Sequence, residues 1–60
     1  MNRVKKFKLG MEVQDRLGQR CRVNAISRDT IAIEAYDYDL GKWSGVWEYV
    51  TRDDVWEVEK

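Results

Sequence analysis

Histidine and proline are absent from this chain of 60 residues, and cysteine occurs once, as Cys21. Without histidine, the chain lacks the commonest general base and the commonest metal ligand. A single cysteine allows neither an intrachain disulfide nor a cysteine-rich zinc site, which favours a protein of the reducing cytoplasm. We expect Cys21 to be a buried, unreactive thiol, and we expect no metal or other cofactor.

Long hydrophobic runs are also absent. The longest run is Ile31-Ala32-Ile33, far below the roughly 20 apolar residues that cross a bilayer. The basic beginning of the chain is not followed by an apolar stretch, so it does not have the form of a secretory signal. No membrane association is therefore expected.

The length predicts one small domain over residues 1–60, with residues 1–5 as a flexible basic arm. Such a chain has no room for a catalytic cleft between domains. No P-loop, catalytic triad or pair of carboxylates with catalytic spacing can be assembled from the sequence. We therefore expect a binding module rather than an enzyme, and no small-molecule substrate is implied.

Apolar and polar residues alternate with a period of two, which is typical of half-buried β-strands. The pattern predicts strands over 7–14, 20–25, 31–36, 46–50 and 55–59, with tight turns at 16–19 and 27–29 and a loop at 39–45. Thr51 and Asp54 have the spacing of a capping box, which indicates one 3₁₀-like turn before the last strand. Five short strands with this turn predict an all-β, five-stranded SH3-like small barrel.

The turn at 27–29 fixes an expected register for the two strands that it joins. Pairing Ala25 with Ile31, Val23 with Ile33 and Cys21 with Ala35 brings the apolar faces of both strands together. The same register sets Arg22 against Glu34 on the outer face, a cross-strand ion pair worth about 0.2–1 kcal/mol.

Several short motifs support this fold. They are Gly10-Met11-Glu12-Val13, Gly18-Gln19-Arg20-Cys21-Arg22-Val23 with Ile26, Asp37-Tyr38 with Gly41, and Glu48-Tyr49-Val50 with Val55. Over roughly residues 9–58 the chain thereby resembles the Tudor and KOW group of SH3-like barrels. Cys21 stands where KOW sequences carry a second glycine, and Gly41 does not follow Tyr38 directly as it does in Tudor domains. The resemblance implies the barrel, in which exposed aromatic residues can form a cage for a cationic side chain.

The aromatic residues of the second half are the leading candidate site. They are Tyr36, Tyr38, Trp43, Trp47, Tyr49 and Trp56. If Val46 and Val50 point inward, Trp47 and Tyr49 are exposed on the other face of their strand. We predict recognition of a protein partner, by a small adaptor or inhibitor, through Trp43, Trp47, Tyr49 and Tyr38, with self-association as one form of it. In the alternative interpretation, Trp47 and Trp56 fill the core.

The basic residues of the first half offer a second hypothesis. Arg20, Arg22 and Arg28 could contact phosphates while Tyr36 stacks on a base, as nucleic-acid binding requires. Alternatively, these basic residues are solvated charges that protect strand edges against aggregation. Asp53, Asp54, Glu57 and Glu59 are better explained as a solvated turn than as a metal site.

The net charge of zero conceals a division along the chain. Residues 1–28 contain eight basic and two acidic residues, and residues 29–60 contain three basic and nine acidic ones. Folding can interleave the two halves or leave a basic and an acidic face, and the second outcome would favour docking to a charged partner.

Overall fold

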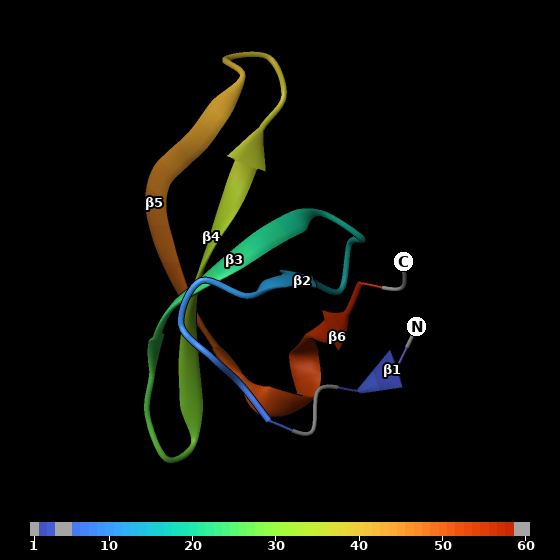
Figure 1. Ribbon diagram of the computed structural model, residues 1–60, viewed down its shortest axis with the longest axis vertical. Helices are drawn as coiled ribbons and strands as arrows, with labels where there is room; N and C mark the ends of the chain where they lie inside the picture. Colours follow the sequence, from blue (N-terminus) through green and yellow to red (C-terminus); the bar gives the residue numbers. More distant parts are fainter. Residues whose placement is uncertain (1, 4–5, 59–60) are drawn as a thin grey trace.

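The protein is a single antiparallel sheet with one 3₁₀ turn, in a computed structural model that describes residues 2–3 and 6–58 (Figure 1). The strands lie in the order β1-β6-β2-β3-β4-β5 across the sheet. Their bounds are β1 Asn2–Arg3, β2 Glu12–Gln14, β3 Arg20–Ile26, β4 Thr30–Asp37, β5 Lys42–Thr51 and β6 Trp56–Glu57, with the 3₁₀ helix η1 at Arg52–Asp54. The all-β prediction of five strands with a 3₁₀ turn before the last is confirmed, and β1 is an additional short strand.

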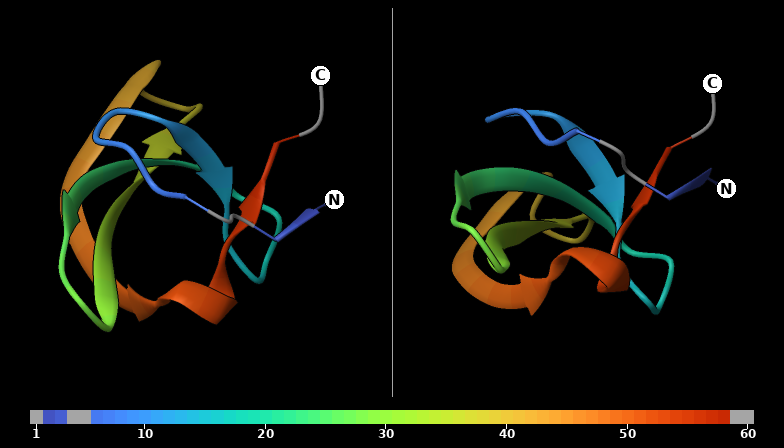
Figure 2. Two further views of the ribbon diagram at one scale, coloured as in Figure 1. Left: turned by 60° about the horizontal axis from the view of Figure 1, so that its bottom comes forward. Right: turned by 90° about the horizontal axis from the view of Figure 1, so that it is seen from below.

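The sheet curls strongly, so that η1 carries the chain from the end of β5 across to β6, beside β2 (Figure 2). The concave side holds the core, which consists of Phe7, Val13, Cys21, Val23, Ile31, Ile33 and Val55. Met11, Ala35 and Val50 pack against this core and are partly buried. Cys21 is buried, as predicted. Among the described residues, none belongs to a helix that could span a membrane.

The first predicted strand is wrong over most of its length. β2 begins at Glu12, because the chain turns at Leu9 and Gly10, where Gly10 has a φ of 84°. Only glycine adopts this left-handed conformation without steric cost. Leu9, which the alternation placed inward, is 69% exposed, while Phe7 reaches the core across the turn.

The register of β3 and β4 is confirmed over half of the hairpin. Cys21 pairs with Ala35 and Val23 with Ile33, but Ala25 lies opposite Ala32 instead of Ile31. One extra residue on β3, Asn24, causes this shift as a β-bulge.

The fourth predicted strand, which corresponds to β5, begins earlier than predicted. β5 includes residues 42–45, which were expected in a loop, and Trp43 is therefore a strand residue. Three residues of β5, Ser44 to Val46, lie opposite the single residue Ala35 of β4, so β5 contains a bulge. Val46 was expected to point inward if Val50 did, but it is 71% exposed on this bulge, whereas Val50 contacts the core.

The 3₁₀ turn lies where the capping box predicted it, with different bonding. Thr51 makes no side-chain hydrogen bond to the backbone of η1. Its hydroxyl donates instead to Oδ2 of Asp54 at 3.0 Å. The final strand is limited to Trp56–Glu57, and its predicted end at Glu59 lies outside the described residues.

The first and last described strands, β1 and β6, pair at one edge of the sheet. Asn2 pairs with Glu57 and Arg3 with Trp56. The predicted arm at residues 1–5 therefore contains strand β1, and its residues 1, 4 and 5 lie outside the description. This pairing places a strand of the first, basic half of the chain beside a strand of the second, acidic half.

Candidate functional site

The convex side of β3, β4 and β5 carries most of the residues that the sequence singled out. Residues that pair directly across an antiparallel sheet point to the same side. Arg22 pairs with Glu34, Glu34 with Trp47, Ala32 with Tyr49, and Tyr36 with Trp43. We call this surface the aromatic face and define it by Arg20, Arg22, Tyr36, Trp43, Trp47 and Tyr49.

A compact cluster of rings and guanidinium groups forms one end of the aromatic face. The ring of Tyr36 meets those of Tyr38 and Trp43 edge-on, with centroids 4.9 and 5.3 Å apart. The guanidinium carbon of Arg20 lies 4.7 Å from the centroid of Tyr36 and 5.3 Å from that of Trp43. These distances are those of cation–π contacts, so Arg20 already occupies the cation position between the two rings.

Both arginines of this cluster are also paired with carboxylates. Nη2 of Arg20 donates a hydrogen bond to Oε1 of Glu12 and forms an ion pair with it across β2 and β3. This hydrogen bond is the main cause of a raised pKa for Arg20. Nε of Arg20 is shielded from solvent and has no hydrogen-bond acceptor among the described residues. The guanidinium carbon of Arg22 lies 4.7 Å from the ring centroid of Trp43 while its Nη2 contacts Glu34 at 2.9 Å.

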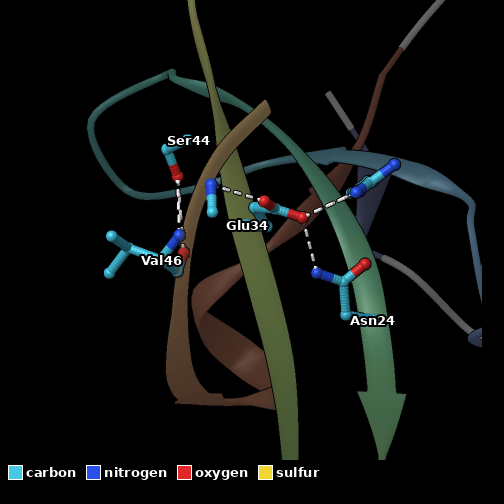
Figure 3. A network of polar contacts seen from close by, with 6 residues as sticks. Asn24, Glu34, Ser44 and Val46 are labelled. Carbon is cyan, nitrogen blue, oxygen red and sulfur yellow. Dashed lines mark hydrogen bonds and ion pairs between the residues drawn. The ribbon is translucent and has the colours of Figure 1, made fainter. Parts of the chain in front are cut away.

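Glu34 is the buried centre of a polar network beneath the aromatic face (Figure 3). Its Oε1 accepts hydrogen bonds from Nε of Arg22 at 2.9 Å and from Nδ2 of Asn24 at 2.8 Å. Its Oε2 accepts a hydrogen bond from the backbone N–H of Gly45 at 2.6 Å. The Asn24 hydrogen bond, followed by those of Arg22 and Gly45, outweighs burial and lowers the pKa of Glu34.

Glu34 thereby joins both bulges of the sheet. Asn24 is the extra residue of the β3 bulge, and Gly45 lies in the β5 bulge with a φ of 80°. The sequence predicted the Arg22–Glu34 ion pair, which is confirmed. It did not predict that Glu34 is buried, nor that Asn24 and Gly45 bind it, because alternation alone does not locate bulges.

The other end of the aromatic face is more open. Trp47 is 51% exposed and Tyr49 is 68% exposed, so Trp47 does not fill the core. Tyr38, at the β4–β5 turn, is 71% exposed, and Trp56 on β6 is half-buried. The nucleic-acid hypothesis named Arg20, Arg22, Arg28 and Tyr36, and only Arg28 lies away from the aromatic face. It lies in the turn between β3 and β4, where its backbone carbonyl accepts a hydrogen bond from Nε of Arg52.

The single thiol lies on the opposite, concave side. Burial, followed by the negative charges of Asp15 and Glu48, raises the pKa of Cys21 to about 11. A nucleophilic cysteine requires the reverse shift, because the thiolate is the reactive form. Among residues 2–3 and 6–58, no group of three or more cysteine or acidic residues is placed to hold a metal ion.

Comparisons of the chain with protein-family models, with curated proteins and with solved structures find no match.

Proposed function

We propose that this protein is a non-enzymatic module that recognises a protein partner through the Trp47 and Tyr49 end of its aromatic face. The observation that carries the proposal is the exposure of these two large rings, 51% and 68%, side by side on one strand. Exposed tryptophan and tyrosine are enriched at protein contacts because each ring buries a large area at a low cost in conformational entropy. Tyr38 and Trp43 extend the contact toward the β4–β5 turn.

The fold that we propose for this module is an SH3-like barrel of the Tudor and KOW kind. A strongly curled antiparallel sheet with a 3₁₀ turn before its last strand supports this assignment. A cage for a cationic ligand at Tyr36 and Trp43 is less well supported, because Arg20 of the chain itself lies against both rings. We therefore place the partner contact at Trp47 and Tyr49.

Nucleic-acid binding is the second candidate, because Arg20, Arg22 and Tyr36 share the aromatic face. However, Arg20 is paired with Glu12 and Arg22 with Glu34, which reduces the positive charge available to phosphates. If nucleic acid is the ligand, its affinity must fall steeply as salt is raised, because phosphate contacts release counterions.

Affinity capture from a cell lysate, with and without nuclease, separates these candidates. The wild type, Trp47→Ala and the control Leu9→Ala serve as baits, since Leu9 is a comparably exposed apolar residue outside the aromatic face. We expect a nuclease-resistant protein that binds the wild type and Leu9→Ala but not Trp47→Ala. Nucleic acid retained equally by all three baits, without any protein that depends on Trp47, would contradict the proposal.

A further inference from the structure

The outer edge of β5 is the starting point for a more specific inference, which rests on the proposed function. β5 is the last strand of the sheet order, and no described strand pairs with its outer side. It is ten residues long. Its second half, residues 47–51, which we call the edge segment, contains one charged residue, Glu48, and no proline or glycine. Long edges of this composition are templates for the addition of another strand.

The hydrogen-bond pattern shows which backbone groups of the edge segment face outward. Val23 directs both its backbone groups away from β4, since its N–H donates to Met11 at 3.0 Å and its carbonyl accepts from Gly10 at 2.8 Å. Antiparallel ladders alternate, so its partner Ile33 directs its own groups toward Glu48 of β5. The same alternation then leaves the backbone groups of Trp47 and Tyr49 directed toward the free edge.

The two sides of the edge segment differ in chemistry. Trp47 and Tyr49 lie on the aromatic face, whereas Glu48 pairs with Ile33 and lies on the concave side. A pocket of about 330 Å³ beside Glu48 is lined by the end of β5, including Tyr49, by η1 and by the β2–β3 turn. Three carboxylates line it, those of Asp15, Glu48 and Asp54, together with one cation, Arg16.

The three carboxylates of this pocket differ in their hydrogen bonds. Oδ1 of Asp15 accepts hydrogen bonds from the N–H groups of Leu17 and Gln19, and Asp54 accepts one from Thr51. Glu48 is exposed, and its carboxylate makes no hydrogen bond or ion pair with another residue in the described part of the chain. A strand that pairs with the edge segment would place the side chain opposite Glu48 at this pocket.

We propose that the edge segment binds an extended segment of the partner protein in which lysine or arginine alternates with apolar residues. Main-chain hydrogen bonds to Trp47 and Tyr49 hold the added strand, its apolar side chains pack on their rings, and its basic side chains face the carboxylate pocket. A second copy of this chain is the poorer occupant, because pairing two β5 strands would bring a second Glu48 beside the same three carboxylates.

Titration of the ¹⁵N-labelled chain with synthetic peptides, followed by NMR, tests this proposal. The probe is a capped peptide of four Lys-Val repeats. Its controls are a peptide of four Glu-Val repeats and a Lys-Val peptide that is N-methylated at every second residue, which cannot complete the main-chain ladder. We expect only the unmodified Lys-Val peptide to bind, and we expect it to slow hydrogen exchange of the Trp47 and Tyr49 amides.

Two variants separate a specific ion contact from general attraction. Glu48→Gln should weaken binding of the Lys-Val peptide about three- to tenfold, since it removes a charge that faces the added strand. Asp39→Asn removes the same charge at the exposed β4–β5 turn and should leave the affinity within about twofold, because salt screens distant surface charges.

Equal binding of the Lys-Val and Glu-Val peptides, retained binding of the N-methylated peptide, or no binding would overturn the proposal. Concentration-dependent protection of the same amides in the free chain would overturn it too, in favour of a second copy. A captured protein that requires Trp47 but binds Glu48→Gln and the wild type equally would sustain the proposed function while removing this inference.

Discussion

The two ends of the aromatic face differ in what lies against their rings. At the Tyr36 and Trp43 end, two guanidinium groups of the chain itself cover the rings, and each is neutralised by a carboxylate. At the Trp47 and Tyr49 end, the rings are more exposed and border an unpaired strand edge. Similar residue types can therefore serve stability at one end and remain available to a partner at the other.

The largest effect should come from Glu34, which holds the covered end together. Glu34→Gln keeps the volume but removes the negative charge that pairs with Arg22, and it directs an amide N–H₂ group at other hydrogen-bond donors. We expect the Tm to fall by at least about 10 °C, because the buried carboxylate of Glu34 accepts hydrogen bonds from three donors, and a buried donor left without its acceptor is costly in a small domain. Thermal unfolding followed by circular dichroism measures this, with Glu48→Gln as the control; equal Tm values for the two variants would contradict it.

Trp43→Ala tests the rings of the covered end. The substitution removes a half-buried ring and the cation–π contacts of Arg20 and Arg22. We expect the free energy of unfolding to fall by about 2 kcal/mol. Urea unfolding of the wild type and the variant, with equal m-values, measures this change in the free energy of unfolding. A loss below about 0.5 kcal/mol would place Trp43 with the open end instead.

The acid dependence of stability tests the same network in the wild type. The pKa of Glu34 is lowered from 4.5 by folding, so its ionised form stabilises the folded chain above that pH. This contribution should disappear as the pH falls below about 4.5 and through the folded pKa. Urea unfolding at several pH values between 6 and 2 measures it. Glu34→Gln should show a shallower decline, and parallel curves for the two proteins would contradict the assignment.

Trp47→Ala tests the open end and should affect stability little. Because Trp47 is about half exposed, we expect a loss of less than about 1 kcal/mol in the free energy of unfolding, together with loss of the proposed partner binding. Urea unfolding and affinity capture on the same preparation measure both quantities. A large loss of stability with capture retained would reverse the comparison between the two ends.

The smallest effect concerns the thiol beneath the sheet. Because the pKa of Cys21 is raised to about 11, the folded chain should react slowly with a thiol reagent at pH 8, and addition of urea should accelerate the reaction. The pKa of the thiol is near 9 in the unfolded chain, so ionisation favours the unfolded chain above that pH. The free energy of unfolding should therefore fall between pH 9 and 11. Rapid labelling of the folded chain would contradict this.

The sequence predicted what depends on alternation and missed what depends on backbone irregularity. Pairing of Arg22 with Glu34 and exposure of Trp47 and Tyr49 follow from a period of two, which is visible in the residues themselves. Gly10 and Gly45 look alike in sequence, yet one turns the chain before β2 and the other serves a bulge inside β5. The backbone N–H of Gly45 meets its acceptor, the carboxylate of Glu34, only in the folded sheet, so the sequence alone does not distinguish the two roles.

The network around Glu34 also has a consequence for how this sequence can diverge. Asn24, Glu34 and Gly45 are separated along the chain but form one hydrogen-bonded unit, in which each bulge depends on the same carboxylate. A relative that replaces Glu34 should therefore also replace Asn24 and shorten or straighten the strand around Gly45, because a bulge that loses its acceptor leaves a donor unsatisfied. These three positions should be inherited and lost together, whereas Trp47 and Tyr49, whose rings are exposed, can change and leave the sheet intact.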